Sequence, residues 1–335
     1  MSSSRPIETM AQAIVAAHRH ALALPLADAT PPLFEPADPV CRAALQAATA
    51  LGFIAPDALC VAAAWLRQTR RTGRFDPADW PDAPADFGVA PMPPADAFAP
   101  CPRALGLYAV LPDAAWVGRM ARAGVPTVQL RFKSADPQAV RGEVHAAVAA
   151  VHGSGALLFI NDHWQAAIEA GAYGVHLGQE DLARLDGDAL RTIRAAGLRL
   201  GLSSHGYAEM LRAEALGPSY LALGAVFATT LKRMATPPQG LGRLHAYARL
   251  MRDHSLVAIG GIDGARLPAV LASGVGSVGI VRALVTAPQP EAAAAALMAV
   301  IDAATTPAAI REVTPAATAT ADFKTGARMQ ATRPE

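Results

Sequence analysis

The feature that most constrains this 335-residue chain is a regular alternation of short apolar runs and amphipathic helical stretches between residues 105 and 304. The apolar runs are LGLYAVL, VPTVQLR, ALLFIND, YGVHLG, LRLGLSS, SYLALGAVF, LVAIGG and SVGIV. A strand followed by a helix, repeated many times, is typical of βαβ units and a parallel sheet. Eight such units in this length reach the lower size limit of a closed barrel, so the pattern predicts an α/β fold, a (β/α)8 TIM barrel.

An open, doubly wound parallel sheet is the alternative architecture for the same alternation. That fold commonly carries a GxGxxG segment after its first strand and reverses its strand order at one point. The first apolar run is followed by no such segment, and no reversal point is visible in the sequence. The barrel is therefore favoured.

The regions on either side of the barrel have different compositions. Residues 1–75 are rich in Ala and Leu at helical spacing and predict an N-terminal extension of two or three helices, the clearest running from Asp57, its expected N-cap, to Arg70. Residues 76–102 contain eight prolines and predict a linker before a barrel domain at 103–304. Residues 305–335 lack apolar periodicity and predict a disordered tail.

Charge and cysteine content limit the partners and the compartment. The formal net charge is +1, from 29 basic and 28 acidic residues, so binding to nucleic acid or to a membrane surface is not expected. The three cysteines, Cys41, Cys60 and Cys101, all precede the predicted barrel and support neither a disulfide framework nor a zinc site. The apolar stretch 11–27 is interrupted by charged and His residues, unlike a signal peptide. We expect a cytoplasmic protein and leave open whether it forms a homo-oligomer.

Polar residues or glycines follow seven consecutive strands of the predicted barrel. In a parallel barrel these strand ends share one face, so residues far apart in sequence converge there. The residues are Gln129, Arg131 and Lys133, then Asn161 and Asp162, then His176, Gln179 and Asp181, then Ser203 and His205, then Thr229, Thr230 and Lys232, then Gly260 and Gly261, and lastly Arg282. The sequence therefore predicts a ligand site on this face.

The QLRFK segment places three polar side chains on one face of its strand. Strand alternation puts Gln129, Arg131 and Lys133 together, with Leu130 and Phe132 on the other face. A solvated barrel rim with a simple salt bridge is the plain alternative. Two cations beside carboxylates from neighbouring strands favour a ligand site instead.

Asp162 and Asp181 follow neighbouring strands, so both carboxylates can reach one hard cation. Mg²⁺ prefers few carboxylates, with water and phosphate oxygens completing its shell. The alternative is that each aspartate only caps the helix that follows it. Because capping does not explain the nearby cations, we predict a Mg²⁺ site.

The last two strands are followed by residues suited to a phosphate group. Barrel enzymes commonly bind phosphate in the loops after strands 7 and 8, where glycine lets backbone N–H groups approach the anion. Gly260 and Gly261 stand at that position, although a tight turn alone would also require glycine. His176 and His205 are as readily hydrogen-bonded wall residues as acid–base groups.

The motifs together resemble the thiamine phosphate synthase family over residues 105–304. QLRFK resembles the family's QxRxK segment, and IND (160–162) and HLGQEDL (176–182) resemble its two metal loops. LSSH (202–205), FATTLK (227–232), PQGL (238–241) and AIGGI (258–262) follow in family order. The joint order and spacing are far more specific than any single motif.

The resemblance implies a Mg²⁺-dependent transferase that joins an aminopyrimidine diphosphate to a thiazole phosphate and releases pyrophosphate. It implies that Asp162 and Asp181 hold Mg²⁺ and that the catalytic contacts to the diphosphate come from Arg131, Lys133, Asn161 and Lys232. It further implies that Gln129, His176 and Ser203 face the aminopyrimidine. Thr229, Thr230, Gly261 and Arg282 are expected at the thiazole phosphate.

Two positions depart from the family pattern. Leu231 stands where the family has a second Thr, and Arg282 stands where it has Ser. The Arg282 guanidinium could replace the lost phosphate contacts, because its geometry suits bidentate binding. A thiazole tautomerase on the same barrel, which needs no metal pair, and a catalytically silent phosphate-binding barrel are the alternative functions.

The N-terminal hundred residues faintly resemble the C-terminal end of a pyrimidine phosphate kinase found fused to some synthases. No nucleotide-binding core accompanies the similarity, so kinase activity is not expected. We predict a helical packing or dimerisation appendage.

Overall fold

The computed structural model describes residues 4–25, 36–91, 93–229 and 236–305. Thr230, Leu231, Lys232 and the predicted tail from residue 306 onward lie outside the described residues.

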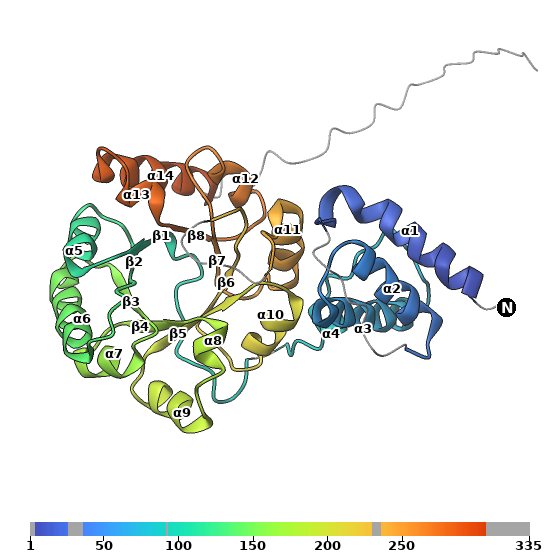
Figure 1. Cartoon of the computed structure of the whole chain (residues 1–335), viewed down its shortest axis with the longest axis horizontal. Helices are drawn as coiled ribbons and strands as arrows, with labels where there is room; N and C mark the ends of the chain where they lie inside the picture. Colours follow the sequence, from blue (N-terminus) through green and yellow to red (C-terminus); the bar gives the residue numbers. More distant parts are fainter. Residues whose placement is uncertain (1–3, 26–35, 92, 230–235, 306–335) are drawn as a thin grey trace, which may run out of the picture.

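Eight parallel strands close into a barrel in chain order, and β1 pairs with both β2 and β8 (Figure 1). The strands are β1 Gly106–Leu111, β2 Thr127–Leu130, β3 Leu157–Asn161, β4 Gly174–Leu177, β5 Arg199–Ser204, β6 Tyr220–Leu223, β7 Leu256–Ile259 and β8 Ser277–Ile280. Each strand lies within the apolar run that predicted it. The predicted TIM barrel is confirmed, and the β1–β8 pairing excludes an open sheet.

Helices follow the strands and surround the barrel (Figure 1). They are α5 Ala114–Arg122, α6 Pro137–Val151, α7 Trp164–Ala170, α8 Gln179–Leu182, α9 Gly187–Ala195, α10 Tyr207–Glu214, α11 Gly240–Leu250, α12 Leu267–Leu271, α13 Arg282–Val285 and α14 Pro290–Thr305. Aspartates cap three of these helices by accepting hydrogen bonds from first-turn N–H groups. They are Asp113 on α5, Asp136 on α6 and Asp186 on α9.

The inside of the barrel is filled by large side chains that alternate along the strands. Tyr108, Phe159 and Tyr220 pack against one another, with ring centroids 5.2–5.8 Å apart. Gly201 of β5 leaves room for this packing, because a Cβ atom there would lie 2.1 Å from the Tyr220 ring. The interior is therefore a packed core, and a ligand can enter only at the ends of the barrel.

Three helices form the N-terminal extension, α1 Ser4–Leu22, α2 Pro39–Ala50 and α3 Ala55–Thr72. They pack on one another and lie beside α10 and α11 of the barrel (Figure 1). Phe53, Trp65 and Trp80 form an aromatic cluster between the two parts, and the Trp80 indole N–H donates to the hydroxyl of Tyr207 in α10 at 3.0 Å. The extension is thus joined to the barrel by a buried interface.

Two buried charged side chains cross this interface, and we call their contacts the junction. The Asp57 carboxylate accepts a hydrogen bond from the backbone N–H of Ala208 at 2.8 Å, and Asp57 is 3% exposed. The prediction that Asp57 caps its own helix is wrong, because Ile54 holds that position in α3. The first turn of α10 has no side-chain cap of its own, so Asp57 satisfies it from another part of the chain.

Arg243 of α11 is the second buried charge of the junction. Its guanidinium donates to the carbonyl oxygens of Leu22 and Leu51 at 3.0 and 2.9 Å and to Gln239 Oε1 at 3.2 Å. It also lies 3.7 Å from the centroid of the Phe53 ring. Arg243 therefore ties two segments of the extension to the start of α11.

The Pro-rich segment contacts both parts of the molecule. It contains the short helix α4, Pro84–Phe87. Its last residues run under the barrel, where Phe98 N–H donates to the Gly217 carbonyl at 2.8 Å and the Ser219 hydroxyl donates to the Ala99 carbonyl at 2.6 Å. Cys101 packs there against the barrel interior, although it precedes β1. The segment closes the amino-terminal end of the barrel.

All three cysteines are free. In the part of the chain that the structure describes, every helix is too short or too polar to cross a membrane.

Candidate active site

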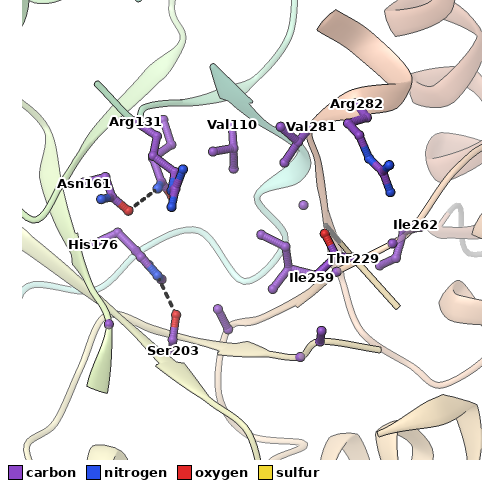
Figure 2. A pocket seen from close by; sticks show the side chains of 18 of the residues that line it. Val110, Arg131, Asn161, His176, Ser203, Thr229, Ile259, Ile262, Val281 and Arg282 are labelled. Carbon is purple, nitrogen blue, oxygen red and sulfur yellow. Dashed lines mark hydrogen bonds between the residues drawn. The ribbon is translucent and has the colours of Figure 1, made fainter. Parts of the chain in front are cut away.

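A pocket of about 620 Å³ opens at the carboxyl ends of the strands (Figure 2). It brings together thirteen residues predicted from strand ends, namely Gln129, Arg131, Lys133, Asn161, Asp162, His176, Asp181, Ser203, His205, Thr229, Gly260, Gly261 and Arg282. Gln179 does not line it and instead donates from Nε2 to the Ser203 carbonyl at 2.6 Å. Thr230 and Lys232 lie outside the described residues, so their predicted roles stay predictions.

Two carboxyl groups meet on one side of the pocket mouth. The carboxyl groups of Asp162 and Asp181 lie close enough for each to shift the pKa of the other, and Lys133 Nζ lies 2.5 Å from Asp162 Oδ2. Burial followed by the charge of Asp162 raises the pKa of Asp181. Burial would also raise the pKa of Asp162, but the hydrogen bond and charge of Lys133 lower it overall. The two adjacent carboxyl groups would therefore gain from a further cation.

The backbone of Asp162, one member of this pair, has an unusual conformation. Within the described residues Asp162 is the one non-glycine residue with a positive φ, 66°. Aspartate tolerates this left-handed conformation better than most residues, but it remains less favourable than an ordinary one. A strained backbone at a charged pocket residue is a common mark of a functional position.

Neither aspartate acts as a helix cap. His163, the residue after Asp162, holds the cap position of α7, and Gly178 holds that of α8; neither makes a side-chain cap bond. Asp181 lies inside α8. The alternative that these carboxylates only cap helices is therefore wrong.

In the part of the chain that the structure describes, no third acidic or sulfur ligand joins the two carboxylates. Across the described ranges, no group of three or more His, Cys, Asp or Glu side chains is placed to hold a metal ion. A cation bound by Asp162 and Asp181 would take its other ligands from water or from oxygens of a bound substrate. This donor set, two carboxylates with open positions, suits Mg²⁺ better than Zn²⁺.

The bottom of the pocket is a continuous set of hydrogen bonds, which we call the interior chain. Its members come from β5, β4, β6, β1, β2 and β3, in the order Ser203, His176, Tyr220, Tyr108, Gln129 and Asn161. Two of its hydrogen bonds are drawn in Figure 2, one from His176 to Ser203 and one to Asn161. Gln129, Asn161 and His176 are each less than 9% exposed.

The two tyrosines of the interior chain were not predicted as site residues. They lie beneath the pocket lining and are 2% exposed. Burial raises the pKa of Tyr108 and of Tyr220 well above the ordinary value, so both are neutral hydroxyls. A signal for them exists in the sequence, because strand alternation places both on the inward face.

The Gly260–Gly261 pair packs against the segment that leaves β6. Both residues have positive φ values, 103° and 64°, and a Cβ atom at either would lie 2.5 Å from Ala225 or Ala228. The backbone N–H groups of Val226 and Phe227 donate to the carbonyls of Ile259 and Gly260. The glycines therefore shape a tight turn, as the plain alternative held, and that turn also lines the pocket.

Further cations line the pocket mouth besides Lys133 and Arg184, which pair with Asp162 and Asp181. Among the described residues, Arg131 and Arg282 have no ion-pair partner, and Arg282 is exposed near Thr229 and Ile262 (Figure 2). Arg266, which the sequence did not single out, stacks on Phe227 at 4.7 Å and bonds the Gly261 carbonyl. Further unpredicted lining residues are Glu180, Arg184, Ser204 and Asp263.

His205 is held by a neighbouring carboxylate. Its Nδ1 lies 2.6 Å from Glu209 Oε2, and the same oxygen accepts from the His205 backbone N–H at 2.8 Å. His205 is therefore a hydrogen-bonded wall residue. In chemical terms, the whole pocket can hold an anionic ligand together with a divalent cation.

Comparisons with known proteins agree with this geometry. A family model described as thiamine monophosphate synthase matches residues 107–284. The chain is 53% identical over 205 residues to a thiamine-phosphate synthase of Neisseria gonorrhoeae, covering 61% of this chain and 98% of that protein. It is 49% identical over 201 residues to one of Escherichia coli, covering 60% and 94%.

A solved structure is similar as well. Thiamine phosphate pyrophosphorylase from Pyrococcus furiosus superimposes with a TM-score of 0.53 at 26% identity, covering 60% of this chain and 98% of that one. The helical extension lies outside the family match.

Proposed function

This chain belongs to the thiamine monophosphate synthase family, and we propose that it joins 4-amino-2-methyl-5-hydroxymethylpyrimidine diphosphate to thiazole phosphate, giving thiamine phosphate and pyrophosphate. The observation that carries the proposal is the pocket mouth, where two adjacent carboxyl groups and several cations line a cavity large enough for a phosphorylated ligand. The reaction is a substitution in which the diphosphate leaves before the thiazole nitrogen attacks.

Mg²⁺ is the proposed cofactor, held by Asp162 and Asp181. The fit rests on the two adjacent carboxyl groups and on the raised pKa of Asp181, since a divalent cation would offset both the cost of burying its charge and its repulsion from Asp162. When bound, Mg²⁺ would neutralise charge on the oxygens of the leaving diphosphate. In its absence Lys133 gives part of that compensation through its contact with Asp162.

The chain's own residues would bind the diphosphate and stabilise its departure. Arg131 and Lys133 extend from the end of β2, and Asn161 ends β3, so three donors reach the same side of the pocket. Lys232, outside the described residues, is proposed as a fourth. Fixed donors that meet developing negative charge lower the barrier without reorganisation, and each contributes about 3 kcal/mol.

The aminopyrimidine would lie over the interior chain, against Gln129, His176 and Ser203. The thiazole phosphate would lie on the opposite side of the pocket, near Thr229, Gly261 and Arg282, with Thr230 as a further proposed contact. Figure 2 supports this division, because His176 and Ser203 lie on one side of the cavity and Arg282 and Thr229 on the other. The arrangement would place the two reacting groups in line across the pocket.

One assay tests the proposal. Both substrates are incubated with the full-length protein with and without Mg²⁺, and thiamine phosphate and pyrophosphate are measured. We expect both products in equal amounts only with Mg²⁺. Metal-independent isomerisation of a thiazole substrate would instead indicate a tautomerase, and binding without turnover would indicate a silent barrel.

The cytoplasm is the proposed location, supported by the three free thiols, which a reducing compartment maintains. Whether the protein forms a homo-oligomer stays a prediction to be measured in solution.

A further inference from the structure

The interior chain has a direction that its own chemistry sets. Gln129 Oε1 can only accept, so the Tyr108 hydroxyl donates to it at 2.9 Å, and Gln129 Nε2 donates to Asn161 Oδ1 at 2.9 Å. The Tyr108 oxygen, having used its proton, then accepts from the Tyr220 hydroxyl at 2.7 Å. These hydrogen bonds fix which atoms donate and which accept at the β3 end of the interior chain.

The order of donors and acceptors extends to the β5 end of the interior chain. Tyr220 has given its proton to Tyr108, so its oxygen accepts from His176 Nδ1–H at 2.7 Å. A neutral imidazole protonated on Nδ1 has an accepting Nε2, so the Ser203 hydroxyl donates to His176 at 2.8 Å. Ser203 then faces the pocket with only acceptor lone pairs.

We propose that Tyr108 and Tyr220 are positioning residues of the synthase reaction, which they serve by fixing the polarity of both ends of the interior chain. At one end Ser203 is an acceptor for a substrate N–H group. At the other end, the Asn161 amide oxygen accepts from Gln129, so Asn161 presents its amide nitrogen to the pocket as a donor. The proposal rests on the proposed function and names the chemistry of the substrate edge, an amino group rather than a carbonyl oxygen.

The arrangement also links the two parts of one substrate. Asn161 is proposed to contact the diphosphate and Ser203 the ring, and four buried residues connect them across the barrel. In a buried site an unpaired donor or acceptor is costly, so one orientation of all six groups is favoured over mixtures. Binding a ring with the wrong polarity at Ser203 would leave such an unpaired group.

Tyr108→Phe gives the sharpest test, because it removes the acceptor on which Tyr220 depends. The Tyr220 hydroxyl would then turn to His176 Nδ1, the imidazole proton would move to Nε2, and Ser203 would become an acceptor of that proton with its own O–H free to donate. We expect the His176 tautomer to change from Nδ1–H to Nε2–H, observed by ¹⁵N NMR of histidine-labelled protein and assigned with a His176→Gln variant.

Kinetics of the same variant test the link to the substrate. We expect kcat/KM for the aminopyrimidine diphosphate to fall by about tenfold or more, with KM for thiazole phosphate unchanged. Preference for the amino substrate over its 4-oxo analogue should fall by about tenfold as well, because Ser203 would then be able to donate. Tyr220→Phe should lower kcat/KM similarly but leave His176 Nδ1 without its acceptor.

Tyr207→Phe is the matched control. Tyr207 is another fully buried tyrosine, hydrogen-bonded to Trp80 and outside the pocket lining. It should lose stability to a similar degree while keeping the wild-type tautomer and substrate preference. Equal kinetic changes in Tyr207→Phe and Tyr108→Phe would overturn the proposal.

The ¹⁵N NMR spectrum of the wild-type protein tests the proposed direction of the interior chain even if the variants fail to fold. An Nε2-protonated His176 in the free wild-type protein would contradict the assigned direction. Absence of thiamine phosphate formation by wild type, with His176 protonated on Nδ1, would instead refute the proposed function and leave the interior chain standing.

Discussion

The pocket mouth and the junction both bring carboxylates and cations together, but the charged groups have different partners in the two places. At the junction, Arg243 has protein acceptors for three of its N–H groups, and Asp57 accepts from a helix terminus. At the pocket mouth, the side chain of Asp181 is 33% exposed, pairs with the exposed Arg184 at 3.4 Å and also faces the carboxyl group of Asp162, while Arg131 and Arg282 have no ion pair within the described residues.

The difference separates charges that serve the fold from charges that serve a ligand. A buried charge whose hydrogen bonds are all made within the protein stabilises one structure, and removal of its partner is costly. A half-exposed cluster with unbalanced charge adds little stability. Variants at the pocket mouth should therefore lose activity and keep stability, whereas junction variants that remove a hydrogen-bonding group should lose stability and keep activity.

Asp162→Asn and Asp181→Asn should show the largest effect. Each removes one proposed ligand of Mg²⁺ and part of the charge stabilisation of the leaving group, so kcat should fall by about a hundredfold or more. The thermal midpoint should change little. Asp188→Asn is the control, because Asp188 pairs with Arg191 on the exposed surface of α9. Near-normal, Mg²⁺-dependent turnover in either pocket variant would end the proposed metal role.

Arg243→Ala tests the opposite half of the comparison. It leaves the carbonyls of Leu22 and Leu51 without their donor, so unfolding by urea should require about 3 kcal/mol less free energy. Arg249→Ala on the same helix is the control: its salt bridge with Asp82 is largely exposed and should contribute less than about 1 kcal/mol. Equal losses in the two variants would mean that burial of Arg243 adds nothing.

Two substitutions of Asp57 distinguish the effect of its hydrogen bond from the effect of its charge. Asp57→Ala should cost about 1 kcal/mol, because the Ala208 N–H loses its cap. Asp57→Asn keeps an oxygen acceptor and removes the charge. Burial raises the pKa of Asp57 above its ordinary value of 3.8, so the folded state holds this proton more tightly than the unfolded state, and the ionised group lowers stability above the raised pKa.

The sign of the pH effect follows from that shift. Relative to wild type, Asp57→Asn should be more stable at about pH 7, and this advantage should shrink as the pH falls toward about 4, because a larger share of the folded wild-type Asp57 is then protonated. Urea unfolding at both pH values measures the difference. A constant difference between the two proteins would show that Asp57 has an ordinary pKa.

Arg282→Ala should have the smallest effect. Because Arg282 is exposed, its contact with a phosphate group is screened by water, and KM for thiazole phosphate should rise by about threefold to fivefold with kcat unchanged. The matched control is Arg191→Ala, another exposed arginine outside the pocket. An unchanged KM would rule out Arg282 as the replacement for the family's missing phosphate contacts.

Much of the fold was predictable because its signal repeats along the chain. Each of the eight apolar runs contains one strand, and the closed order placed their polar ends together. Arg131, Lys133, Asp162 and Asp181 could be identified for that reason, and their place in one pocket depends only on strand order.

What could not be predicted depends on contacts between distant segments. Asp57 looked like a cap for its own helix, but its partner Ala208 lies in the barrel, and no local pattern specifies that contact. Tyr108 and Tyr220 lie in apolar runs, where hydroxyl groups give no sign of their partners. Their pairing depends on barrel register and side-chain length, which become definite only when the strands close.

The segment before β1 has a practical consequence for anyone dividing this protein. Hydrogen bonds join this segment, at Phe98, Ala99 and Pro102, to residues just before β6 and β7, which come much later in the chain. A truncation that starts at the first strand would remove the segment that covers the amino-terminal end of the barrel and expose the packed barrel interior to water. An excised barrel should therefore begin upstream of residue 98, even though the family similarity begins at 107.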